Sequence, residues 1–361
     1  MTSKTHLVIF LTALLCGGIF FPAGAAGRDG EDIDEAARAA VVTETANLVR
    51  GYYVYPETGG RMAQVIRKKL AAGEYDLISD FTRLAARLTA DLRAVSRDLH
   101  LRLRYDPDTA AALIQAGPEG TDLQRRRAAR ERRNNFGFAR LENMAGNVGL
   151  LDLRFFADTA YARDTAVAAM AWLAHADAVI VDLRFNGGGS PRMVQFLCSY
   201  FFGPEPVHLN SLYWRPSDRT DEFWTLRELP GKRMPDVPLF ILTSPRTFSG
   251  AEEFTYDLKN LERAVVVGET TGGGAHPVNM KAVGREIVFS IPVGRAINPV
   301  TGTDWEGTGV TPDMPVPAEQ ASAHAHRLAL KAILEKSSDP AWNRELRRLI
   351  ARIDSDLSRR R

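Results

Sequence analysis

The stretch "LFILTSPRTFSGAEEFTYDL", residues 239–258, contains a change of pattern that decides the fold class. Its first four residues are apolar, as in a strand that is buried on both faces of a sheet. Ser249 and Glu252, three positions apart, form the capping-box signature of a helix start, and a helical pattern follows them. The stretch therefore predicts a buried strand, a loop and a helix.

The same alternation extends along the middle of the chain. Strands are predicted for "GNVGLLDLRFF", "DAVIVDLRFN", "RAVVVGE" and "EIVFSIPVG", and helices for "DTAVAAMAWLAHA" and "PRMVQFLCSYFF". Apolar strands that alternate with helices imply a sheet covered on both faces. We therefore expect an α/β fold.

Both ends of the chain are predicted to be helical. Residues 30–98 contain about three amphipathic segments, which predict an N-terminal helical bundle, and residues 317–361 contain two more. The α/β core is expected at residues 99–316, beginning with the alternating strand "DLHLRLRYDP". Within it, the polar, Arg-rich segment 106–134 is interpreted as a linker, an excursion or an extra helix.

The first 25 residues have the pattern of a signal peptide, with Lys4, an apolar run and a small-residue cleavage site at Ala23 to Ala25. This pattern predicts an exported protein, periplasmic or secreted, without a stable membrane span after cleavage; an uncleaved anchor is the alternative. Cleavage would leave Cys198 as the single cysteine, which excludes an intrachain disulfide and a Cys-based zinc site. The net charge of +2 gives no reason to expect nucleic acid.

Three loops follow predicted strands, at the ends where chemistry gathers in α/β sheets. The first carries Gly187 to Gly189, the second carries Ser249, and the third, "VVVGETTGGGAHPV", carries another glycine triplet and His276. Neither the phosphate-loop nor the dinucleotide-binding pattern of glycines is present. An oxyanion hole and a plain turn remain for the first loop, and a nucleophile and a simple helix cap remain for Ser249.

A serine nucleophile needs a neighbouring group that accepts its proton. His100 stands where the helical bundle meets the first strand of the core, with Asp98 close by. His276 is the second candidate and Lys281 the third. No spacing rule connects any of them with Ser249.

Four motifs carry a resemblance to a known family. "DLRFNGGGSP", "ILTSPRTFSGAEEF", "VVVGETTGGGAHP" and "WEGTGVTPDMPV" occur in the order and spacing of the S41 serine peptidases, and the chain resembles them over about residues 35–316. The helical start resembles the branch related to interphotoreceptor retinoid-binding protein, without a PDZ segment. The resemblance implies a ClpP/crotonase-like βαβ core and an endopeptidase for peptides or unfolded protein tails. It implies no metal and no cofactor, and it is compatible with a homo-oligomer.

The resemblance also implies which residues attack and which accept the proton. Ser249 matches the nucleophile of the family, and His100 matches the general base of the tricorn-type branch. The processing-peptidase branch has a lysine base where this chain has Gly274, which argues against a Ser–Lys pair.

The supporting residues follow from the same resemblance. Glu252 matches the acidic residue three positions after the nucleophile, and Glu306 resembles the one that orients the relay. The N–H group of Gly250 and those of Gly187 or Gly188 match the oxyanion hole.

The alternative function is a catalytically weak or silent binding protein for apolar ligands on the same scaffold. Ordinary core packing is the favoured interpretation of the aromatic residues that could line its pocket, which are Phe136, Phe138, Phe155, Phe156 and Trp172. An esterase is a third reading, because the same acyl-transfer groups accept esters.

Overall fold

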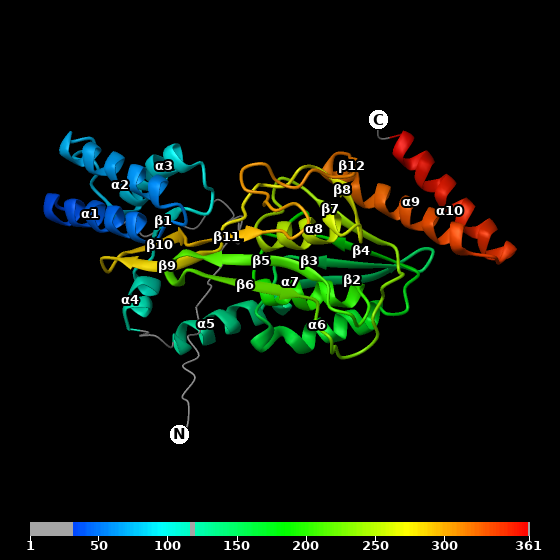
Figure 1. Ribbon diagram of the computed structural model, residues 1–361. Helices are drawn as coiled ribbons and strands as arrows, with labels where there is room; N and C mark the ends of the chain where they lie inside the picture. Colours follow the sequence, from blue (N-terminus) through cyan, green and yellow to red (C-terminus); the bar gives the residue numbers. More distant parts are fainter. Residues whose placement is uncertain (1–31, 116–119, 360–361) are drawn as a thin grey trace, which may run out of the picture.

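The computed structural model describes residues 32–115 and 120–359, so the predicted signal peptide at residues 1–25 lies outside the described residues. Three helices come first, strands and helices then alternate, and two long helices end the described chain (Figure 1). The helices are α1 (Glu35–Tyr52), α2 (Pro56–Ala71), α3 (Phe81–Ser96), α4 (Pro107–Gln115), α5 (Thr121–Arg132), α6 (Thr159–Leu173), α7 (Pro191–Cys198), α8 (Gly250–Asn260), α9 (Ala318–Lys336) and α10 (Pro340–Ser358). The strands are β1 (Arg102–Tyr105), β2 (Phe138–Met144), β3 (Val148–Leu153), β4 (Ala178–Asp182), β5 (His208–Trp214), β6 (Arg219–Trp224), β7 (Leu239–Thr243), β8 (Val265–Gly268), β9 (Val278–Val283), β10 (Ile287–Pro292), β11 (Gly294–Ile297) and β12 (Met314–Pro315).

The central sheet has six strands in the order β12-β8-β7-β4-β3-β2. Its pairs are parallel except for β2 with β3. Successive side chains of a strand point to opposite faces, and both faces are covered here. Val181 and Ile241 pack in one core with α6, α7 and α8, whereas Ile180 and Phe240 pack in another with α9. This arrangement confirms the predicted α/β class.

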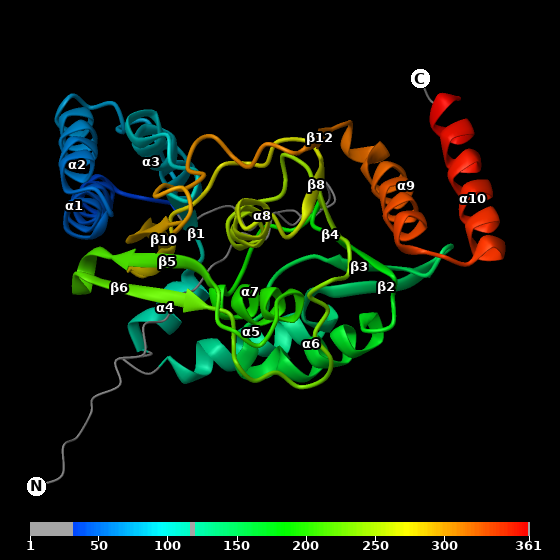
Figure 2. The ribbon, with the colours of Figure 1, turned by 45° about the vertical axis from the view of Figure 1, so that its right-hand side comes forward.

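The N-terminal helices share their core with a small antiparallel sheet of order β1-β10-β9. In this sheet Arg102 pairs with Ser290, so the residues just before β1 are brought beside the C-terminal half of the chain. Figure 2 shows α1 to α3 at one end of the molecule, α9 and α10 at the other, and α8 between them. A third sheet of order β11-β5-β6 completes the fold.

The segment 106–134 contains the helices α4 and α5, so the extra-helix interpretation is the one that the described part of it supports. Of the aromatic residues considered for an apolar pocket, Phe138 and Phe156 are buried in the core beneath the sheet, and Phe136 and Phe155 pack against it. Trp172 is 44% exposed on α6. Within residues 32–115 and 120–359, every helix is too short or too polar to cross a bilayer.

Candidate active site

Ser249 is the residue that precedes α8, directly after the loop that follows β7. Its φ of 55° and ψ of −123° lie outside the conformations that non-glycine residues favour, and such conformations typically cost about 1–3 kcal/mol each. The predicted capping box holds it, since the Ser249 N–H donates to Oε2 of Glu252 at 2.8 Å. The Ser249 side chain is thereby held at the positive end of the α8 dipole.

Glu252 also ties α8 to the third glycine loop. Its buried carboxylate accepts hydrogen bonds from the hydroxyl of Thr271 at 2.5 Å and from the N–H groups of Gly273 at 2.6 Å and Gly274 at 2.8 Å. Burial raises the pKa of Glu252 to about 7, while these donors and the Ser249 N–H pull it downward. The residue therefore joins two of the three loops predicted to carry the chemistry.

The structure brings His100 to Ser249 across 149 residues of sequence. Nε2 of His100 lies 3.1 Å from Oγ of Ser249, and the ring packs against that of Phe248 with centroids 4.6 Å apart. Burial lowers the pKa of His100 to about 4, although the negative charge of Asp98 acts to raise it. The imidazole is therefore neutral near pH 7, as a proton acceptor must be.

The other two candidate bases lie elsewhere. Lys281 is on β9, where its Nζ sits 4.8 Å from the centre of the Tyr52 ring. At Gly274, where the resemblance places the lysine of the processing branch, a side chain fits only if His100 and Phe248 move. A Cβ there would lie 2.6 Å from Cε1 of His100 and 2.2 Å from Cζ of Phe248.

His276 contacts Asp98 instead of Ser249. Its Nδ1 lies 2.7 Å from Oδ2 of Asp98 and 3.5 Å from Oε2 of Glu306. Burial alone would lower the pKa of His276, but the hydrogen bond and charge of Asp98 raise it. Asp98 also faces His100: its Oδ1 accepts the His100 backbone N–H at 2.9 Å and lies 3.9 Å from Nδ1.

Glu306, which the resemblance assigns to orienting the relay, lies beside His276. Its Oε2 accepts the N–H of Ala275 at 2.6 Å and faces His276, because the loop after Trp305 folds back on the third glycine loop. Burial and the charge of Asp98 raise the pKa of Glu306 to about 8. The potential ligand atoms of Asp98, His276 and Glu306 lie within 4.8 Å of one another, a spacing that a metal ion could also use.

The first glycine loop packs directly against Ser249, and its three N–H groups differ in use. The N–H of Gly188 donates to Oδ1 of Asn186 at 2.8 Å, so it is occupied within the loop. By contrast, among the described residues the N–H groups of Gly187, Gly189 and Gly250 have no protein acceptor. Gly188 has φ 103°, and a Cβ on it would lie 2.8 Å from Cβ of Ser249, which explains why glycine stands there.

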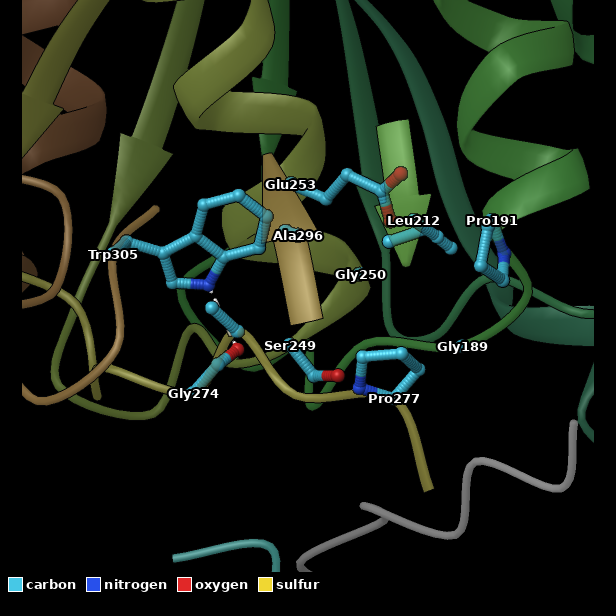
Figure 3. A pocket seen from close by; sticks show the side chains of 11 residues that line it. Gly189, Pro191, Leu212, Ser249, Gly250, Glu253, Gly274, Pro277, Ala296 and Trp305 are labelled. Carbon is cyan, nitrogen blue, oxygen red and sulfur yellow. Dashed lines mark hydrogen bonds between the residues drawn. The ribbon is translucent and has the colours of Figure 1, made fainter. Parts of the chain in front are cut away.

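Ser249 opens into a small pocket (Figure 3). Trp305 stands on one side of it and Leu212 and Pro191 on the other, and the indole N–H of Trp305 donates to the carbonyl of Gly274 at 2.7 Å. Its volume is about 20 Å³, which is room for about one water molecule. Gly189 and Gly250 line the same pocket as Ser249.

Sequence reasoning missed three residues that hold this site together. Asp98 was noted beside His100 without a role, and Tyr53, whose hydroxyl donates to Oδ2 of Asp98 at 3.2 Å, gave no signal at all. Asn186 directly precedes the glycine triplet. Its side chain donates to the carbonyl of Leu153 at 2.9 Å and its own carbonyl accepts the N–H of Phe248 at 3.0 Å. An amide next to a glycine triplet is a signal that could have been used.

Comparison with solved structures shows the same fold in other proteins. A lipoprotein from Streptococcus agalactiae is 14% identical with a TM-score of 0.54, and the match covers 82% of this chain and 96% of that one. A candidate peptidase from Parabacteroides merdae is 16% identical with a TM-score of 0.53, over 79% and 90% of the two chains. The tricorn protease is 12% identical with a TM-score of 0.51, over 82% of this chain and 37% of that one. The chain spans about half, 53%, of a candidate S41 protease from Bacteroides fragilis.

Comparison with protein families gives two matches, one after the other along the chain. The model of the N-terminal domain of S41 peptidases in eukaryotic IRBP matches residues 35–127. The model of peptidase family S41 itself matches residues 147–316. The first match contains His100 and the second contains Ser249. The chain belongs to peptidase family S41, a family of serine-type peptidases.

Proposed function

We propose that this chain is an exported serine endopeptidase that cleaves peptides or unfolded protein tails, with Ser249 as nucleophile and His100 as general base. The observation that carries the proposal is the 3.1 Å separation of His100 Nε2 from Ser249 Oγ, which is within hydrogen-bond reach. The membership of family S41 supports the peptidase, and the signal-peptide pattern of the first 25 residues supports export.

The reaction follows the logic of acyl transfer. Oγ of Ser249 attacks the carbonyl carbon of the substrate while Nε2 of His100 takes the hydroxyl proton, and His100 then gives that proton to the leaving amine. A water molecule attacks the resulting ester while His100 takes its proton, and His100 then returns that proton to Oγ of Ser249 as the carboxylic acid leaves.

The oxyanion of the tetrahedral intermediate is stabilised by backbone N–H groups. Gly250 supplies one, at the start of α8, where the helix dipole adds to it. Gly189 supplies the second in preference to Gly188, because the Gly188 N–H is used by Asn186 whereas Gly189 lines the same pocket as Ser249.

Labelling with a fluorophosphonate probe tests the proposal without knowledge of the natural substrate. The intact protein is expected to become covalently labelled on Ser249, and Ser249→Ala is expected to abolish labelling without unfolding the protein. Absence of labelling in the folded protein, or labelling that persists in Ser249→Ala, would overturn the proposal and favour a carrier on the same scaffold.

A further inference from the structure

Nδ1 of His100 has no hydrogen-bond partner where the proposed mechanism needs one. When Nε2 accepts the Ser249 proton, Nδ1 carries the other ring proton and shares the imidazolium charge. Nδ1 is buried and, in the part of the chain that the structure describes, makes no hydrogen bond. A buried N–H without an acceptor is unfavourable, and a buried positive charge without a counter-charge more so.

The carboxylate that faces Nδ1 is Asp98. Its Oδ1 lies 3.9 Å from Nδ1 and accepts the backbone N–H of His100 at 2.9 Å. A carboxylate oxygen has more than one lone pair, so Oδ1 can accept both N–H groups. Asp98 and His100 belong to the same short turn of chain before β1, so they are already aligned with one another.

The other oxygen of Asp98 is held from the opposite side. Oδ2 accepts the hydroxyl of Tyr53 at 3.2 Å and faces Nδ1 of His276 at 2.7 Å. His276 is itself held, since Oε2 of Glu306 lies 3.5 Å from the same Nδ1 and is anchored by the N–H of Ala275. The Asp98 carboxylate therefore lies between two imidazoles, and one of them approaches Ser249.

We propose that Asp98 is the positioning carboxylate for His100, and that the N–H of His276, braced by Glu306, sets the orientation of Asp98. The inference rests on the proposed function, since it names the residues that act through the proposed base. It assigns to Asp98 the role that the family resemblance gave to Glu306, and it moves Glu306 to the support of His276.

The contact between Asp98 and His100 shortens as the reaction proceeds. Oδ1 must approach Nδ1 by about 1 Å to reach an ordinary hydrogen-bond distance, and that contact strengthens as the imidazolium forms. It therefore acts on the chemical step and not on binding. The titratable and charged groups around the pair are Tyr53, Tyr55, Arg93, His276, Asp304 and Glu306.

The test compares the rate constant of covalent fluorophosphonate labelling, kinact, with the probe's dissociation constant, KI, in the full chain. Asp98→Asn is expected to lower kinact by about 100-fold to 10,000-fold with KI unchanged, because the amide stabilises the wrong tautomer of His100. His276→Leu is expected to lower kinact at least about tenfold. His276→Asn keeps an N–H near the position of Nδ1 and is expected to stay within about threefold of the wild type.

Asp91→Asn is the matched control, since Asp91 is also a buried aspartate that accepts a tyrosine hydroxyl, that of Tyr75 at 2.8 Å, but within the N-terminal helices. It is expected to change the unfolding midpoint and not kinact. Wild-type kinact in Asp98→Asn, or equal kinact in the two His276 variants, would overturn the inference. If Asp98→Asn does not fold, the two His276 variants still test it. Failure of the wild type to react would instead overturn the proposed function.

Discussion

Gly274→Ala should move the proposed general base by a distance that the structure fixes. The backbone of Gly274 is not in the left-handed region, so alanine is allowed there and only the added Cβ acts. That Cβ would lie 2.6 Å from Cε1 of His100 and 2.2 Å from Cζ of Phe248, whereas ordinary contacts begin at 3.4 Å. The imidazole must therefore retreat by about 0.8 Å and the phenyl ring by about 1.2 Å.

The expected cost has two parts. A displacement of about 1 Å at a catalytic group lowers the rate by about 100-fold, so kinact for the fluorophosphonate should fall by that order. Overpacking a buried site typically costs about 1–3 kcal/mol, which urea unfolding measures as a lower midpoint with the same slope.

Gly60→Ala serves as the control, because it makes the same substitution in α2 with no atom within 4 Å of the new Cβ. It should leave kinact unchanged and increase the free energy of unfolding by about 0.5–1 kcal/mol. A Gly274→Ala protein that is labelled at the wild-type rate would show that His100 does not occupy the space beside Gly274 during the reaction. That result would refute the proposal that His100 is the general base.

Three further outcomes are expected. Because His100 must be neutral to accept a proton and burial lowers its pKa to about 4, kinact should not decline as pH falls from 7 to 5; a decline centred at the ordinary histidine value of 6.5 would contradict the buried base. Glu252→Gln should lower the free energy of unfolding by about 2–4 kcal/mol in urea titration, because the amide N–H of the glutamine would face donors whose hydrogen bonds the carboxylate accepts in the wild type. Glu253→Gln keeps its acceptor for Asn210 and should cost much less. Gly188→Ala should abolish labelling, because its Cβ would lie 2.7 Å from the Gly250 nitrogen and its φ is 103°. The control Gly203→Ala, whose Cβ would have no atom within 4 Å, should be labelled like the wild type. Labelling of Gly188→Ala would show that the first glycine loop is not packed on Ser249.

The local patterns of the sequence were enough to predict the central sheet. Residues 178–181 and 239–242 are apolar throughout because each strand is buried on both faces, and the helices between them have their own periodicity. Strands β5 and β6 were not predicted, because "HLNSLYW" and "RTDEFW" mix polar and apolar residues without a regular alternation, although β5 is the mostly buried central strand of its sheet. The helix start at Ser249 was predicted because a capping box is a local signal.

The site was less predictable, since its members meet through long-range pairing. No local rule relates His100 to Ser249; the pairing of β1 with β10 brings them together. The resemblance implied a base and a nucleophile and gave Glu306 the role of orienting the relay, but it could not tell that the loop around Trp305 directs Glu306 to His276. Sequence spacing cannot predict which side chains meet when a loop conformation decides their contacts.

The division of the site between two parts of the chain has a consequence for how the enzyme is built. Ser249 and the glycine loops belong to the α/β core. His100, Asp98 and Tyr53 belong to the N-terminal region, which precedes β1, the strand that pairs with β10. In a Ser–Lys arrangement the base would follow from the core alone, at position 274, but here that space is filled by the rings of His100 and Phe248. The N-terminal region therefore supplies the proposed base and its proposed carboxylate, so we expect a change in how this region packs against β10 to alter the proton transfer at Ser249.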